Sequence, residues 1–184
     1  SDALESEIVY LLDYSDCRTI FVEDEEQADK VMSLPNSQSK IDLIIYDEPK
    51  EMNKYKDKRL IAYKDLIEIG RKRKMINGEP YHKMLEKISE DDTSIFCPTS
   101  GTTAHPKLAM ISHKSLLNHA KNYLIADPKD SSDEYVSVLP LPWIMEQTYS
   151  VAKWCLCRMK VNFVEEAESL FEDLREIGPT FILF

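Results

Sequence analysis

The sequence predicts an α/β fold in which helices cover both faces of a mainly parallel sheet. Short apolar runs alternate with segments of helical periodicity along the whole chain, and 43% of its 184 residues are hydrophobic. Apolar runs separated by helices indicate βαβ units, whose strands are parallel. A chain of this length buries roughly 70% of its unfolded surface, which is enough for a hydrophobic core.

The first half is expected to alternate between helices and strands. In order these are a helix carrying Leu4, Ile8, Leu11 and Leu12, a strand at Arg18–Val22, a helix at Asp24–Met32 and a strand at Ile41–Tyr46. Residues 47–60 are polar and predict a surface connection. A mostly helical stretch then runs from Tyr63 to Ser89, and Asn77-Gly78-Glu79-Pro80 predicts a break within it.

The second half continues the same alternation. The expected elements are a strand at Thr93–Cys97, a helix from Ser112, a strand at Glu134–Leu139, a helix at Trp143–Cys157, a strand at Met159–Phe163, a helix at Ser169–Ile177 and a strand at Thr180–Phe184. Ser112 is a residue type favoured at the start of a helix, and Gly178-Pro179 is a stop signal.

The chain ends on Phe181-Ile182-Leu183-Phe184, a strand-like apolar run with no polar tail. A buried terminal strand is one explanation. Truncation of a longer protein is the other, and it is the explanation we favour.

The net charge of −10 argues against nucleic acid as a partner, because neutralising phosphates needs a basic face. The one basic run, Arg71-Lys72-Arg73-Lys74, fits a solvated helix face, with phosphate binding as the alternative. No apolar run is long enough to span a membrane, and the acidic first residues carry no signal-peptide core. Peripheral contact with a membrane stays open.

The four cysteines show no pattern of metal ligands. Cys155 and Cys157 are the only close pair, and no second pair lies at zinc-ligand spacing. Cys97 lies in an apolar run and is expected to be a buried thiol. Four unpatterned cysteines fit a reducing compartment, so the expected localisation is cytoplasmic.

One loop carries the residue types of a phosphate site. Residues 99–107 read Thr-Ser-Gly-Thr-Thr-Ala-His-Pro-Lys, which joins four hydroxyls and a glycine to a downstream lysine. Hydroxyls and backbone N–H groups can surround phosphate oxygens while Lys107 supplies a positive charge. The loop is not a Walker loop, because the G-x-x-x-x-G-K-[ST] pattern is absent. Composition alone slightly favours the alternative, a plain polar turn.

The stretch Thr99–Lys107 closely resembles T-S-G-T-T-G-x-P-K-G, the phosphate-binding motif of adenylate-forming enzymes. Ser112-His113 is similar to the S-H pair of that family at the next helix. Residues 139–146 resemble the block that reads L-P-L-A-H-x-x-E in long-chain fatty-acid–CoA ligases, and residues 172–184 resemble the segment after it. The resemblance covers most of the chain and implies the N-terminal αβαβα domain of that family.

The resemblance implies a two-step reaction. A fatty-acid carboxylate attacks the α-phosphorus of ATP with the help of Mg²⁺, and coenzyme A then displaces AMP from the acyl-adenylate. The residues implied to hold the β- and γ-phosphates of ATP are Thr99, Ser100, Gly101, Thr102, Thr103 and Lys107. No residue of the loop is implied to be catalytic, because the substrate carboxylate is the nucleophile, and no metal ligand is assigned.

The sequence departs from the family pattern at three positions. Ala104 and Leu108 stand where the family has glycine, and a non-glycine residue at positive φ costs about 1–2 kcal/mol. Trp143 stands where many members have histidine, and the resemblance implies that it lines the acyl pocket, with a core aromatic as the alternative. Glu146 matches an acidic position of the family.

We expect residues 1–184 to form part of the family's N-terminal domain, with a region before the loop at 1–90 and a phosphate-loop and acyl-pocket region at 91–184. The C-terminal domain and the later Y-G-x-T-E block do not occur in the sequence. The chain alone is therefore expected to be inactive. The alternative is a non-catalytic α/β module that binds a nucleotide or a partner through an altered loop.

Overall fold

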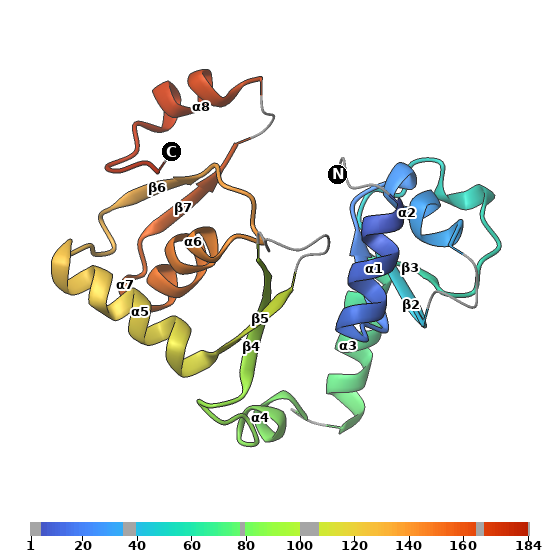
Figure 1. Ribbon diagram of the computed structural model, residues 1–184. Coiled ribbons are helices and arrows are strands. Elements are labelled where there is room, and N and C mark those ends of the chain that lie inside the picture. The colour runs from blue at the N-terminus through green and yellow to red at the C-terminus, as the bar shows by residue number, and fades with distance from the viewer. Residues whose placement is uncertain (1–4, 35–39, 78–79, 100–106, 165–167, 184) are drawn as a thin grey trace. The chain divides into compact units, whose positions relative to one another are not determined.

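The computed structural model describes residues 5–34, 40–77, 80–99, 107–164 and 168–183 (Figure 1). The chain divides into two compact units, Ser1–Glu86 and Lys87–Phe184. Both units combine helices with short parallel sheets. The predicted α/β class is therefore confirmed.

The first unit is built on a three-stranded parallel sheet in the order β1-β2-β3. The strands are β1 (Thr19–Val22), β2 (Leu43–Tyr46) and β3 (Leu60–Ala62). Tyr46 pairs with Val22 on one side and with Ala62 on the other, so β2 is the central strand.

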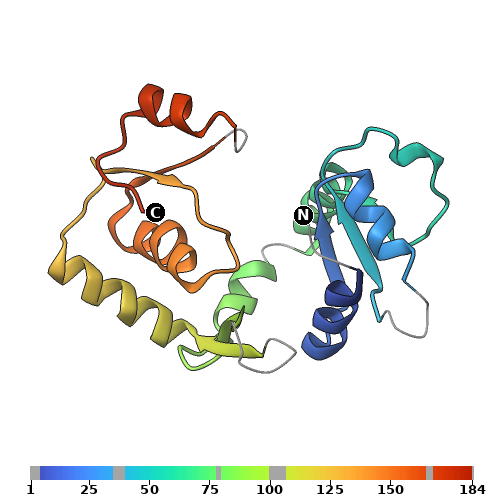
Figure 2. The same ribbon diagram turned by 45° about the horizontal axis from the view of Figure 1, so that its top comes forward.

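The helices of the first unit are α1 (Glu5–Ser15), α2 (Glu25–Met32), α3 (Tyr63–Asn77), the six-residue α4 (Pro80–Leu85) and the short 3₁₀ turn η1 (Met52–Lys54). Asp24 caps α2, because its side chain accepts a hydrogen bond from the Gln27 N–H. Figure 2 shows α1 and α2 beside the sheet. α2 buries Ala28 and Val31 against Val22 and Ile44 of the sheet, and this contact forms the core of the unit.

Two features of the first unit were not predicted. The strand β3 follows a polar stretch and has only three residues, too few to show a period. Residues 47–60 are also more than a surface connection, because Met52 of η1 is buried in the core. A single apolar side chain in a polar loop gives no periodic signal.

The second unit contains one antiparallel and one parallel pair of strands. β4 (Thr93–Pro98) and β5 (Leu108–Ser112) are antiparallel, and β6 (Glu134–Ser137) and β7 (Lys160–Phe163) are parallel. The strand predicted at Thr180–Phe184 is reduced to a single bridge between Phe181 and Tyr135 within the described residues.

The helices of the second unit are α5 (His113–Ala126), α6 (Ile144–Glu146), η2 (Gln147–Lys153), α7 (Trp154–Cys157) and α8 (Leu170–Ile177). The three middle helices follow one another without a break, so the predicted helix over Trp143–Cys157 is confirmed. Its central segment, η2, is a π-helix. Gly178 ends α8 in the left-handed conformation, as the stop signal predicted.

Candidate functional site

The predicted phosphate loop joins the two strands of the β4–β5 hairpin. The paired ladder ends at Pro98 and Leu108, and the Thr99 N–H then donates a hydrogen bond of 2.8 Å to the Lys107 carbonyl. The two ends of the loop are therefore held together by this bond. Thr99 and Lys107 are both exposed at the open end of the hairpin.

The structure describes only part of the predicted site. Thr99 and Lys107 lie within it and adjoin one another. The other predicted phosphate ligands, Ser100, Gly101, Thr102 and Thr103, lie outside the described residues, as does Ala104.

The hairpin has one covered face and one open face. Ile95 and Ile111 pack against a cluster that includes Leu116 and Ala120 of α5. The cross-strand pair Phe96 and Met110 on the other face is exposed. Packing on α5 thus holds the strands from which the loop extends.

The start of α5 is tied to the base of the hairpin. Ser112 is the last residue of β5 and also the N-cap of α5, where its hydroxyl accepts the Ser115 N–H at 3.2 Å. The His113 N–H donates to the Asp92 carbonyl at 3.2 Å. Lys114 forms a 2.7 Å ion pair with Glu90. These local contacts fix the direction in which the hairpin leaves the helix.

Cys97 lies on β4 close to the loop and is buried, as predicted. Burial raises the pKa of its thiol. A buried thiol with a raised pKa is a poor nucleophile, so Cys97 contributes packing rather than chemistry.

The structure shows that replacing the motif's last glycine with Leu108 causes no backbone strain. Leu108 lies in β5 opposite Pro98 and is not among the non-glycine residues with positive φ, which within the described part of the chain are Asp16, Glu51 and Arg158. The expected cost of a left-handed backbone therefore does not arise at Leu108. A strand residue of this kind needs no glycine.

Trp143 is not a core aromatic within this chain, because 56% of its surface is exposed. It precedes α6, and its carbonyl accepts the Gln147 N–H at 3.1 Å while its own N–H donates to the Pro140 carbonyl at 2.9 Å. Gln147 also donates through its side chain to the Leu141 carbonyl at 2.8 Å. The turn that carries Trp143 is thus held to the helix after it.

Glu146, by contrast, is completely buried. Its Oε1 accepts the Ser137 hydroxyl at 2.5 Å and its Oε2 accepts the Tyr135 hydroxyl at 2.8 Å. Both donors lie on β6 two residues apart, where alternate side chains share a face. Burial, followed by the hydrogen bond to Glu146, raises the pKa of Tyr135. The carboxylate therefore links β6 to the helix that follows Trp143.

This linkage was not predicted, although the sequence contains a signal for it. Glu146 is the one acidic residue among the apolar and neutral residues of 139–152. An acidic residue in such a stretch indicates a buried carboxylate that needs donors.

Lys153 is also completely buried, and its ammonium has no hydrogen-bond partner among the described residues. Its Nζ lies 4.3 Å from the ring centre of Tyr149 and 5.1 Å from that of Phe181, with Tyr123 at 5.9 Å. Ring faces attract a cation, and these contacts offset part of the cost of burying the ammonium without a hydrogen bond. Burial lowers the pKa of Lys153.

With this geometry described, a family model for "AMP-binding enzyme" matches residues 2–184. The chain belongs to the AMP-binding enzyme family. The match covers both units and includes the β4–β5 hairpin.

The curated relatives of this AMP-binding chain include several long-chain fatty-acid ligases. It is 35% identical over 95 residues to long-chain-fatty-acid–CoA ligase 1 of Cavia porcellus, covering 49% of this chain and 14% of the relative. It is 25% identical over 187 residues to human long-chain-fatty-acid–CoA ligase ACSBG2, covering 95% and 26%. The chain thus spans about a quarter or less of the length of these relatives.

Solved structures agree on the fold. An anthranilate CoA ligase, AuaEII, in complex with anthranoyl-AMP matches with a TM-score of 0.74 at 17% identity, covering 98% of this chain and 33% of that one. VinN in complex with L-aspartate matches with a TM-score of 0.69 at 17% identity, covering 99% and 40%. At such identities the likeness shows the fold alone.

The described end of the hairpin exposes two of the residue types that can bind phosphate. Lys107 offers an ammonium and Thr99 a hydroxyl, and both residues are exposed. Positive charge and hydroxyl donors are the groups that bind phosphate oxygens. Within the described ranges no three His, Cys, Asp or Glu side chains gather into a group that could hold a metal ion, and no helix is long and apolar enough to cross a bilayer.

Proposed function

We propose that this chain is part of an ATP-dependent acyl-CoA synthetase that activates a long-chain fatty acid. The carboxylate attacks the α-phosphorus of ATP and releases pyrophosphate, and the thiol of coenzyme A then displaces AMP to form the thioester. The observation that carries the proposal is the hairpin that pairs Thr99 with Lys107 in a chain of the AMP-binding family. The names of the curated relatives support the long-chain substrate.

In this proposal the loop grips the β- and γ-phosphates and takes no part in bond formation. Lys107 neutralises phosphate charge, while Thr99, Ser100, Gly101, Thr102 and Thr103 supply hydroxyl and N–H donors. Mg²⁺ would assist by neutralising further phosphate charge, with ligands from outside the described residues. Four free cysteines support a cytoplasmic enzyme.

The 184-residue chain by itself is proposed to be inactive. A grip on the phosphates leaves the adenine, the ribose and the Mg²⁺ ion without contacts. Holding reactants in near-attack geometry is worth about 7–11 kcal/mol, which a one-sided site does not provide. Calorimetry with Mg-ATP should show binding no tighter than about 1 mM. Micromolar binding without adenylation would instead favour the non-catalytic nucleotide-binding module.

The decisive experiment compares lysine variants in a longer protein that contains this chain. Lys107→Ala should weaken the use of ATP by roughly 10- to 150-fold, because one charge-assisted contact is worth about 1.5–3 kcal/mol. The assay is fatty-acid-dependent exchange of pyrophosphate into ATP at varied ATP concentration. Lys121→Ala removes an exposed lysine of α5 and is the matched control. An unchanged KM and rate in Lys107→Ala would remove this residue from the site.

We further propose that Trp143 lines the acyl pocket. Its exposed ring, on a turn held by Gln147, leaves it available to a substrate. Competition between short and long fatty acids should then shift in Trp143→Ala. Equal loss of activity at all chain lengths would contradict a role in the pocket.

A further inference from the structure

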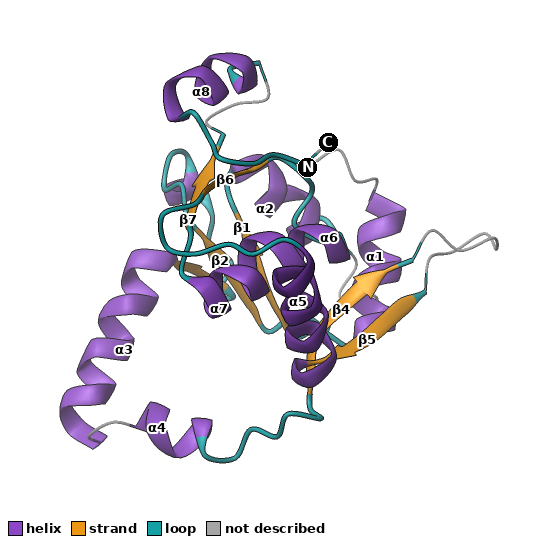
Figure 3. Ribbon diagram, turned by 90° about the vertical axis from the view of Figure 1, so that its left-hand side faces the viewer, coloured by secondary structure: helices purple, strands orange, loops and turns teal. Residues whose placement is uncertain are grey.

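Helix α3 of the first unit is long, and none of its residues from Tyr63 to Ile76 is buried. Its exposed residues include large apolar side chains, with Met75 at 86% and Ile76 at 80%. Gly70, in the middle of the helix, has nothing within 4 Å of the position that a Cβ would occupy. Within the first unit, the first turns of α3 do make packing contacts: Leu66 is half-buried, and the ring of Tyr63 lies 5.2 Å from that of Phe21. The residues from Ile67 to Ile76 are exposed; α3 is labelled in Figure 3.

The same helix carries an excess of positive charge. α3 has five Lys or Arg residues against two Asp or Glu, a net charge of +3, whereas the whole chain carries −10. Four of these bases form the run Arg71-Lys72-Arg73-Lys74, and all four are exposed. This exposure fits both the predicted solvated helix face and its alternative, phosphate binding, and the bases share the helix surface with apolar residues.

One face of α3 combines both properties. Ile69, Lys72, Arg73 and Ile76 are spaced i, i+3, i+4 and i+7, which places them on one side of the helix. We call these four residues the α3 face. All four are exposed, and Ile69 is 52% accessible. Asp65, in the first turn, bounds the face at its N-terminal end.

The bases of the α3 face are available for a partner. Arg71 is paired with Glu68, but no ion pair of Lys72 or Arg73 is found among the described residues. Long basic side chains can lay their methylene stems along an apolar surface and keep the charge at its edge. Two isoleucines with two bases between them can therefore enter an apolar layer while the bases stay at its anionic surface.

We propose that the α3 face docks the protein on an anionic lipid surface. The isoleucines enter the boundary between headgroups and acyl chains, and Lys72 and Arg73 contact lipid phosphates. Charge complementarity fixes the orientation, because the remainder of the chain is strongly acidic and is repelled by the same surface. A long anionic polymer is disfavoured as the partner for the same reason. The proposal is independent of ATP use.

The test is sedimentation of the full chain with vesicles of phosphatidylcholine, with and without phosphatidylglycerol. We expect binding only when phosphatidylglycerol is present, and weaker binding as salt rises. Lys72→Gln/Arg73→Gln should weaken binding about 30-fold, since each base near the surface is worth about fivefold. Ile69→Ser/Ile76→Ser should also abolish most binding. Both changes keep the helix propensity nearly constant.

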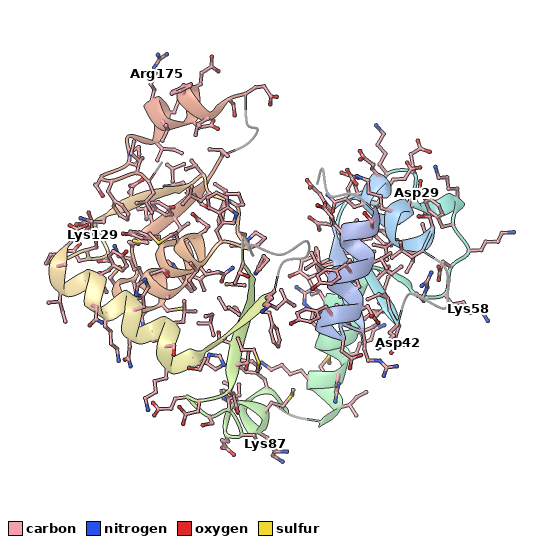
Figure 4. All side chains as sticks on the ribbon, in the orientation of Figure 1. Asp29, Asp42, Lys58, Lys87, Lys129 and Arg175 are labelled. Atoms are coloured by element: carbon pink, nitrogen blue, oxygen red, sulfur yellow. The ribbon has the colours of Figure 1, made fainter. Side chains whose placement is uncertain are left out.

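Matched controls change other parts of the surface. Lys56→Gln/Lys58→Gln alters the net charge equally on the loop before β3, where Lys58 is labelled in Figure 4. Ile125→Ser removes from α5 an isoleucine that is as exposed as Ile76. Neither control should change the binding.

Several results would overturn the proposal. These are no binding to anionic vesicles, equal binding to neutral vesicles, and equal losses in the control variants. Binding by the 184-residue chain but not by the longer ligase would also overturn the proposal, because another part of the enzyme would then cover α3. Variants of the α3 face should leave Mg-ATP titrations unchanged, so failure here is distinct from failure of the proposed ligase function.

Discussion

At the scale of single residues, the two fully buried acidic and basic side chains described in the second unit have different surroundings. Glu146 has a hydroxyl donor for each carboxylate oxygen, whereas Lys153 has only aromatic rings around its ammonium. A buried charged group with its hydrogen bonds satisfied contributes to stability, and an unsatisfied donor costs stability. The two residues should therefore respond to substitution in opposite directions.

Glu146→Ala should lower the free energy of unfolding of the second unit by about 3–5 kcal/mol, because two charge-assisted hydrogen bonds are lost and two buried hydroxyls lose their acceptor. Glu146→Gln keeps an oxygen for one hydroxyl and should cost about 1–2 kcal/mol. Urea unfolding followed by tryptophan fluorescence measures both, because Trp143 and Trp154 are the only tryptophans and both lie in this unit. Glu172→Gln, an exposed change on α8, should have no effect. Equal stability of all three variants would show that the carboxylate is not held as described.

Lys153→Met should raise the free energy of unfolding at pH 7 by about 1–3 kcal/mol, because it removes a buried donor without a partner. The pKa of Lys153 is lowered by burial, so above that lowered pKa the unfolded state binds more protons than the folded state. The stability of the unsubstituted protein therefore rises with pH until about pH 10, and the advantage of Lys153→Met narrows. Urea titrations at several pH values test this, with Lys121→Met as the exposed control. If the difference in unfolding free energy between Lys153→Met and the unsubstituted protein grew with pH, the lowered pKa of Lys153 would be contradicted.

The sequence predicted residues whose role depends on neighbours in the chain better than those whose role depends on distant ones. The Ser112 cap and buried Cys97 were predicted because each follows from its local pattern. The partners of Glu146 and Lys153 were not predicted, because Tyr135 and Phe181 reach them only after β6 and the last segment have packed. Side chains that meet across the fold leave no spacing in the sequence.

At the scale of elements, the helix over residues 144–157 shows how a local irregularity is accommodated. The π-helical segment η2 lies between α6 and α7, and it buries Thr148, Ser150 and Lys153. Thr148 and Ser150 donate through their hydroxyls to the carbonyls of Ile144 and Glu146, each at 2.8 Å. Buried hydroxyls are thus satisfied within the helix itself. Sequence patterns at helical spacing predicted the helix but not its wider turn.

Two glycines provide a matched test of helix energetics. Gly178 ends α8 with φ of +60°, while Gly70 lies inside α3, and neither has atoms within 4 Å of a built Cβ. Gly178→Ala should destabilise the second unit by about 1–2 kcal/mol, because only the backbone conformation is strained. Gly70→Ala should stabilise α3 by about 0.5–1 kcal/mol. Tryptophan fluorescence reports the first change and far-UV circular dichroism the second. A loss of stability at Gly70 would mean that a neighbour does approach α3.

At the scale of the whole molecule, each hydrophobic core draws its residues from one unit. The core of the first unit includes Val22, Ile44 and Met52, whereas Tyr135, Tyr149 and Met159 form a core of the second. A substitution at one of these residues therefore changes the core of one unit only. Separate cores predict separate responses to substitution.

Ile44→Ala should destabilise the first unit by about 2–5 kcal/mol, because Ile44 is fully buried in the central strand. The unfolding curve from circular dichroism should then separate into two transitions, while the tryptophan curve stays unchanged. Glu146→Ala should shift the tryptophan curve instead. If Ile44→Ala moved the tryptophan curve equally, the two units would unfold as one.

The strand pairings of the second unit also predict the order in which its strands form during folding. The hairpin pairs residues close in sequence, with Pro98 opposite Leu108, whereas Glu134 binds Lys160 at a separation of 26 and Thr180 at a separation of 46. Contacts between distant residues close larger loops and so form later. We expect pulse-labelled amide exchange during refolding to protect the amides of β4 and β5 before those of β6. On a ribosome the strands that present Thr99 and Lys107 would then be in place while Phe181 is still to be translated.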